Sequence, residues 1–169
     1  LFPHPVRLRW AAVFLWLWRI SGLRWLVRRS GLLRLFPFLR RMDAIAPEAT
    51  WREVSAGLPE LTPARGERRG RVALVSGCVQ KVFFPGVNEA TIRVLAAEGF
   101  EVLVPPGQGC CGALSVHAGR AEEARRMTRG LVERLEAAAA DWILVNAAGC
   151  GSHLKDLSHL FAGDAAWRD

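Results

Sequence analysis

The chain has 169 residues, of which 51% are hydrophobic, and it is long enough for one domain with an appendage or for two small domains. Its net charge of +7 is unevenly spread: residues 1–42 contain nine arginines and no acidic residue, whereas residues 71–169 are close to neutral. Four cysteines are too few for a secreted disulfide scaffold, and no cleavage site for a signal peptide follows the apolar N-terminal run.

Residues 1–43 are predicted to form short basic helices. Two Ser-Gly pairs, at positions 21–22 and 30–31, separate them, because Ser caps a following helix and Gly ends a preceding one. The uninterrupted apolar run, residues 10–18, is too short to cross a bilayer, which needs about 20 residues. Extending it would place Arg19 in the lipid, so we expect no transmembrane helix.

Two interpretations of this basic segment stay open. It could pack on its own protein with arginine stems lying over apolar surface. Alternatively, residues 1–42 could form a docking surface for an acidic partner subunit or for the anionic face of a membrane. Interleaved Arg and Trp residues would also suit single-stranded nucleic acid, but no nucleic-acid motif accompanies them, so we expect no nucleic-acid partner.

Residues 44–70 are rich in Pro, Glu, Gly and Arg and are predicted to be a linker that ends at a domain boundary near Gly70. Beyond it, short apolar runs alternate with helical patterns. The predicted strands are residues 72–75, 102–104 and 142–145, and the predicted helices are residues 87–99, residues 120–140 and a segment that begins near Ser152. This β-α-β-α-β-α order predicts an α/β domain over residues 71–169, with a Rossmann-like parallel sheet, preceded by the basic helical segment.

Every cysteine of the chain lies in a glycine-flanked turn that follows one of the predicted strands. They are Cys78, Cys110, Cys111 and Cys150. Because parallel strands end at the same edge of a sheet, and α/β proteins bind ligands at that edge, we expect the four sulfurs to converge there. Thiolates prefer zinc, copper(I) and iron–sulfur clusters, so the pattern predicts a metal or iron–sulfur site.

Four thiolates suffice for one [4Fe–4S] cluster or for one tetrahedral zinc ion. The adjacent pair Cys110-Cys111 favours the cluster, because neighbouring thiolates reach two iron atoms more easily than one small ion. Four buried cysteines acting as small hydrophobic residues, and a dithiol–disulfide centre, remain alternatives. His117 and His153 are possible extra ligands. Other residues that could lie near the site are Gln80, Lys81 and Lys155, whereas Asn88 is expected to be an ordinary helix residue.

Three motifs resemble the cysteine-rich CCG domain that occurs in heterodisulfide reductases and in iron–sulfur subunits of respiratory dehydrogenases, that of bacterial glycolate oxidase above all. The motifs are Gly77-Cys78-Val79-Gln80, Gly109-Cys110-Cys111-Gly112 and Asn146-Ala147-Ala148-Gly149-Cys150-Gly151. The broad family motif ends in Cys-x-x-Cys, whereas here His153 stands three residues after Cys150.

The resemblance implies an iron–sulfur cluster, of the [4Fe–4S] type, held by these four cysteines. It implies an electron-transfer subunit of a glycolate oxidase, which passes electrons from a flavoprotein subunit toward a quinone-type acceptor, in the cytoplasm or on the inner face of the membrane. Full members of the family carry a ferredoxin-like domain before this region and a second CCG repeat after it, so the chain resembles an internal fragment. The alternatives are a zinc-binding or structural module, or the equivalent subunit acting on lactate, glycerol 3-phosphate or a heterodisulfide.

Overall fold

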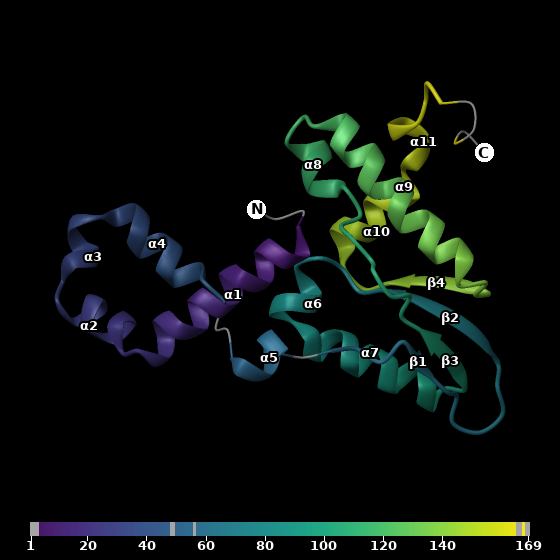
Figure 1. Cartoon of the computed structure of the whole chain (residues 1–169), viewed down its shortest axis with the longest axis horizontal. Coiled ribbons are helices and arrows are strands. Elements are labelled where there is room, and N and C mark those ends of the chain that lie inside the picture. The colour runs from purple at the N-terminus through teal and green to yellow at the C-terminus, as the bar shows by residue number, and fades with distance from the viewer. Residues whose placement is uncertain (1–3, 48–49, 56, 165–166, 168–169) are drawn as a thin grey trace.

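The structure is a computed structural model that describes residues 4–47, 50–55, 57–164 and 167 of the chain. It is a mixed α/β fold in which N-terminal helices precede a four-stranded mixed sheet (Figure 1). The sheet has the order β1-β3-β2-β4. Its strands are β1 (Leu61–Thr62), β2 (Gly70–Val75), β3 (Phe100–Leu103) and β4 (Trp142–Val145).

The three predicted strands are present and parallel. Val72 of β2 is in register with Val102 of β3 on one side and with Trp142 of β4 on the other. The central strand β2 is buried along almost its whole length, which explains why it reads as a continuous apolar run. The carboxyl ends of β2, β3 and β4 therefore lie at one edge of the sheet.

The fourth strand, β1, is a departure from the expected all-parallel sheet. It lies inside the predicted linker and pairs antiparallel with β3, with Leu61 opposite Leu103. The same predicted linker contains helix α5 (Trp51–Ser55). A strand of two residues is too short to show the alternation of apolar and polar residues that predicts a strand. It is therefore recognised only from its hydrogen bonding to β3.

The two long predicted helices cover opposite faces of the sheet. Helix α7 (Pro85–Ala97) places Ile92 against Leu74 of β2, and helix α9 (Ala121–Ala137) places Leu131 against the neighbouring residues Ala73 and Val75. Because successive side chains of a strand point to opposite faces, this alternation fixes one helix on each side.

Four shorter helices complete the α/β part: α6 (Gln80–Phe83), α8 (Ala113–His117), α10 (Ala148–Lys155) and α11 (Leu157–Leu160). The helix expected near Ser152 begins earlier, at Ala148. Cys150 therefore lies in the first turn of α10 and not in the preceding loop.

The predicted short N-terminal helices are confirmed as α1 (Pro5–Ile20), α2 (Leu23–Arg29), α3 (Leu32–Leu35) and α4 (Pro37–Ile45). Gly22 and Gly31 have φ angles of 72° and 75°, in the left-handed region that glycine adopts without strain. The hydroxyl oxygens of Ser21 and Ser30 accept long hydrogen bonds, 3.4 and 3.3 Å, from the N–H groups of Leu23 and Leu32. The two serines stand at the C-caps of α1 and α2, and Gly22 and Gly31 take the N-cap positions that were predicted for serine.

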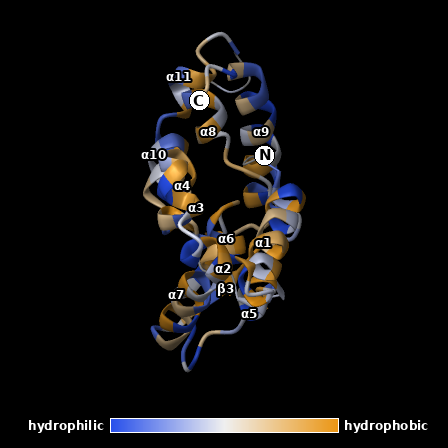
Figure 2. Ribbon diagram, turned by 90° about the vertical axis from the view of Figure 1, so that its left-hand side faces the viewer, coloured by the Kyte–Doolittle hydropathy of each residue, from blue (hydrophilic) through white to orange (hydrophobic). Residues whose placement is uncertain are grey.

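Helices α2 to α4 form an arm that projects from the α/β part (Figure 1). Asp43 links α4 to α2, because its carboxylate accepts hydrogen bonds from both Arg24 and Arg28 of α2. None of these three helices has a buried residue, and Figure 2 shows hydrophobic residues throughout the arm. No helix within the described ranges combines the length and apolar character needed to cross a membrane.

Candidate metal centre

The sheet brings the four cysteines together from three strands. Cys78 stands between β2 and α6, the pair Cys110-Cys111 between β3 and α8, and Cys150 in the first turn of α10 after β4. The parallel pairing of these strands places all three segments at one edge, which confirms the predicted convergence.

The contacts between the thiols form a continuous chain. The Sγ atoms of Cys78 and Cys110 lie 3.4 Å apart. The thiol of Cys111 lies close enough to those of Cys110 and Cys150 for both to raise its pKa. Cys78, Cys110 and Cys111 are buried and Cys150 is half-buried, and none of the four is in a disulfide.

Interactions among the four sulfurs shift their pKa values in opposite directions. The neighbouring Cys111 thiol, and then the hydrogen bond from Cys78, lower the pKa of Cys110 to about 3. The same contacts, with burial, raise the pKa of Cys78 and of Cys111, and the Cys111 thiol lowers the pKa of Cys150. The backbone N–H of Gly112 also points at the Cys110 Sγ atom, 3.4 Å away. The lowered pKa values of Cys110 and Cys150 favour the thiolate, the form that binds metals.

The donor set consists entirely of sulfur, which suits soft metals and iron–sulfur clusters. Within the described part of the chain, no three or more His, Cys, Asp or Glu side chains are arranged as a set that could hold a metal ion. The all-sulfur donor set and its convergence fit an iron–sulfur cluster, in which each thiolate binds its own iron atom.

The histidines do not join the thiols as further donors. His153 contacts a residue that supports the Cys110-Cys111 segment: its Nε2 atom is 3.1 Å from Thr128 Oγ1. Burial lowers the pKa of His153. The Thr128 hydroxyl is itself 2.8 Å from the Cys111 carbonyl oxygen, so the two side chains support the backbone of the site. His117 ends α8 as an exposed residue, and Lys155 is exposed on α10.

A network of amide side chains fixes the segment that carries Cys78. Asn88 is fully buried at 0% exposure and donates a 2.8 Å hydrogen bond to the Ser76 carbonyl oxygen. Gln80 donates to the side-chain oxygens of Asn88 and Asn146. The expectation that Asn88 is an ordinary helix residue is therefore wrong, because its side chain joins α7 to the loop after β2.

The side chain of Gln108, from the loop after β3, also holds the segment that carries Cys78 in place. Its side chain accepts a hydrogen bond from the Ser76 N–H at 3.0 Å and donates to the Leu74 carbonyl oxygen at 2.9 Å. It thereby connects the loop of Cys78 to the loop of the adjacent pair Cys110-Cys111. Neither Gln108 nor Thr128 was predicted from the sequence. Nothing in the sequence around a polar loop or helix residue indicates that its side chain will be buried and hydrogen-bonded to a distant backbone group.

The basic N-terminal segment closes the site on a further side. Leu8 and Ala12 of α1 are buried in one apolar cluster with Cys78, Cys110 and Val82. The first half of α1 therefore packs on its own protein, as the first of the two interpretations expected, and it keeps water away from two of the thiols.

Fold and site together define a cysteine-rich α/β domain covered by a basic helical segment, and comparisons with known proteins agree. Residues 72–155 match the cysteine-rich domain family CCG, and residues 1–46 match the linker region of the glycolate oxidase iron–sulfur subunit. The chain belongs to the glycolate oxidase iron–sulfur subunit family.

Individual relatives give the same picture. The chain is 36% identical over 170 aligned positions to the "Probable glycolate oxidase iron-sulfur subunit" of Bacillus subtilis, covering 100% of this chain and 38% of the relative. It is 31% identical to the glycolate oxidase iron–sulfur subunit of Escherichia coli, over 88% of this chain and 38% of that protein. It is also 35% identical to lactate utilization protein A of Exiguobacterium, over 57% of this chain and 40% of that protein. No solved structure matches the chain.

Proposed function

We propose that this chain is the cysteine-rich part of an electron-transfer subunit, in which Cys78, Cys110, Cys111 and Cys150 are the thiolate ligands of an iron–sulfur cluster of the [4Fe–4S] type. The observation that supports this most strongly is the convergence of all four thiols at the carboxyl edge of the parallel strands. When bound, such a cluster accepts and donates single electrons.

The residues of the chain have separate tasks in this proposal. Burial by α1 and the N–H group of Gly112 near the Cys110 sulfur would set the reduction potential, since hydrogen bonds to sulfur and solvent exclusion both change it. Thr128 and the amide network hold the three cysteine-bearing segments in position.

The proposed complex follows from the relatives, which carry the name of a glycolate oxidase subunit. A flavoprotein subunit would oxidise glycolate and this subunit would carry the electrons toward a quinone-type acceptor. The chain spans 38% of the length of those two relatives, so we propose that it is an internal piece of a longer subunit. Its parts are a connector over residues 1–43, a linker over 44–70 and the CCG domain over 71–169, the first of a pair, whose three parallel strands would form a Rossmann-like sheet.

We further propose a cytoplasmic location with peripheral contact between residues 1–42 and the inner face of the membrane. The arm offers exposed apolar side chains such as Trp25, Phe38 and Leu35, the last 73% exposed, beside arginines and without an unpaired acid of its own. Such surfaces bind anionic bilayers. Flotation of the protein with phosphatidylglycerol vesicles, but not with phosphatidylcholine vesicles, is the expected result. Equal flotation with both, or none with either, would reject the contact.

The electron-transfer role is tested by reconstituting the full-length protein with its flavoprotein partner under anaerobic conditions. Addition of glycolate should bleach the visible absorbance of the iron–sulfur protein. Lactate is the second candidate substrate, because lactate utilization protein A is among the relatives, and bleaching by lactate alone would transfer the proposal to that reaction. Bleaching by neither compound would refute it.

A further inference from the structure

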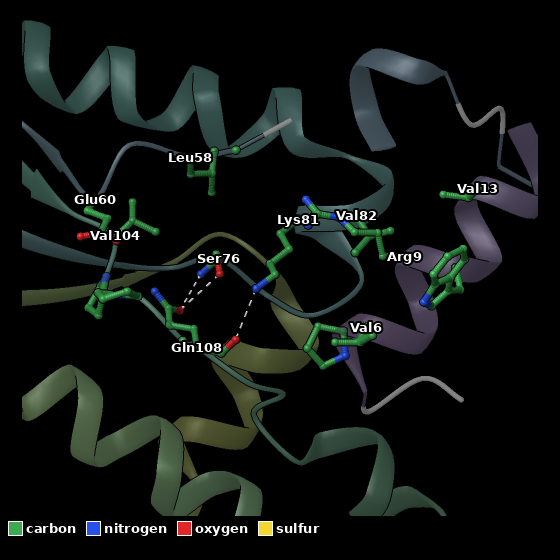
Figure 3. A pocket seen from close by; sticks show the side chains of 16 residues that line it. Val6, Arg9, Val13, Leu58, Glu60, Ser76, Lys81, Val82, Val104 and Gln108 are labelled. Carbon is green, nitrogen blue, oxygen red and sulfur yellow. Dashed lines mark hydrogen bonds between the residues drawn. The ribbon is translucent and has the colours of Figure 1, made fainter. Parts of the chain in front are cut away.

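A separate pocket lies at the same edge of the sheet, between the ends of β2 and β3. It encloses about 730 Å³ and is bounded by α1, by the chain before β1 and by residues 104–108 after β3 (Figure 3). The crevice outside the carboxyl ends of parallel strands is where α/β proteins bind ligands. A volume of this size accepts a small organic molecule.

The walls of the pocket are largely apolar. Val82 and Val104 are buried, and Leu58 and Val13 complete the lining from the chain before β1 and from α1. Val82 also packs in the apolar cluster that contains Cys78 and Cys110. The pocket thus borders the apolar cluster that contains two of the thiols.

Two cations enter this apolar space from different elements, Lys81 from α6 and Arg9 from α1 (Figure 3). Lys81 donates a long hydrogen bond, 3.4 Å, to the Gln108 carbonyl oxygen. No described acidic side chain forms an ion pair with Lys81, and the one carboxylate of the lining, Glu60, lies across the pocket from it in Figure 3.

No described carboxylate therefore compensates the charge of Lys81. Burial, and then the nearby charge of Arg9, lower the pKa of Lys81, and the nearby Cys78 sulfur is the group that raises it. An anion placed between the two cations would offset both lowering effects, and it would form charge-assisted hydrogen bonds, which are stronger than neutral ones.

We propose that this pocket binds an organic anion with an apolar body, held by Lys81 and Arg9 at its anionic group and by Val82 and Val104 along its body. The site is distinct from the thiols and does not depend on the proposed electron-transfer role, although its position would let the ligand influence the neighbouring cysteines.

The test uses 2-naphthoate as the probe, with its fluorescence anisotropy measured during titration of the full-length protein. We expect saturable binding of one naphthoate per chain. Lys81→Gln should weaken it roughly tenfold or more, because one charge-assisted contact is lost. Arg9→Gln should have a similar effect, and the neutral analogue 2-naphthamide should bind weakly and be insensitive to both changes.

Arg34→Gln is the matched control, since it removes one positive charge from the exposed helix α3, away from the pocket. Circular dichroism establishes that each variant is folded. Three outcomes would overturn the proposal: no saturable binding to the folded protein, an equal loss in Arg34→Gln, or equal binding of the acid and the amide. No saturable binding would mean that the pocket does not bind the probe. An equal loss in Arg34→Gln would mean that the anion is attracted by the net positive charge of the chain. Equal binding of the acid and the amide would mean that the pocket recognises only the apolar ring.

Discussion

The Sγ atoms of Cys78 and Cys110 lie 3.4 Å apart although 32 residues separate them in the chain. The contact exists because β2 and β3 are parallel neighbours, so that the loops following them leave the sheet at the same edge. Every proposal about the metal centre rests on this relationship and on its extension through Cys111 to Cys150.

Gly112 is expected to tolerate no side chain. Its φ angle is 97°, and a Cβ atom would lie 2.9 Å from both the Ala124 carbonyl oxygen and Thr128 Oγ1. Gly112→Ala should lower the free energy of unfolding by about 1–3 kcal/mol, because the strained backbone and the close contacts must both be relieved. It should also reduce metal content by displacing the adjacent cysteine pair.

Gly109→Ala is the control for this change, because a Cβ atom at Gly109 would meet no neighbour within 4 Å. Denaturant unfolding of both variants, with metal analysis, measures the difference. Equal stability and equal metal content in the two variants would contradict the role given to the Gly112 backbone.

Asn88→Ala should destabilise the protein by about 1–3 kcal/mol, because the Ser76 carbonyl oxygen and the amides of Gln80 and Asn146 lose a buried partner. Thr91→Val removes only a half-buried contact of the same network and should cost under about 1 kcal/mol. Thermal unfolding compares them. A smaller loss for Asn88→Ala than for Thr91→Val would show that the network does not fix the loop of Cys78.

The link between α2 and α4 should depend on pH. Partial burial raises the pKa of Asp43, but hydrogen bonds from Arg28 and Arg24 outweigh it and hold the pKa below the ordinary 3.8. A lowered pKa contributes stability above the unfolded value, and this is lost as the pH falls through the folded value.

Asp43→Asn should therefore cost about 0.2–1 kcal/mol at neutral pH, the range of exposed ion pairs. It should cost nothing once the pH is well below 3.8. Unfolding of the two proteins across this range measures the difference, and a difference that persists unchanged at low pH would rule out the ionic link.

Much of the α/β part was predictable from the sequence because its signals are local. The apolar runs at 72–75 and 142–145 predicted β2 and β4, and the turns after the strands predicted where the cysteines meet. Strand β1 was not predictable, since its two residues are defined by pairing with β3.

The supporting residues of the site were hidden for a different reason. Asn88 and Gln108 are amides whose partners lie far away in the chain, so only the folded structure shows that they are buried. The packing of Leu8 beside Cys78 was likewise invisible, because a basic apolar helix fits a membrane and a protein core equally well.

Replacing both members of the adjacent pair, Cys110→Ser with Cys111→Ser, should abolish cluster binding and electron transfer while leaving association with partner subunits largely intact. Both side chains are buried, and serine oxygen is a poor ligand for soft metals. Turnover with the flavoprotein partner and co-purification of the subunits measure the two properties. Ser152→Ala, at an exposed position of α10, is the control. Normal electron transfer in the double variant would exclude these cysteines as ligands.

Iron and acid-labile sulfide analysis of the anaerobically purified full-length protein tests the central claim most directly, with a variant in which Cys78, Cys110, Cys111 and Cys150 are all serine as the reference. The account predicts that the wild type contains about four iron and four sulfide atoms more per chain than this variant, as expected for one [4Fe–4S] cluster. Equal iron and sulfide in the two proteins, or near-stoichiometric zinc lost with the four thiols, would contradict it.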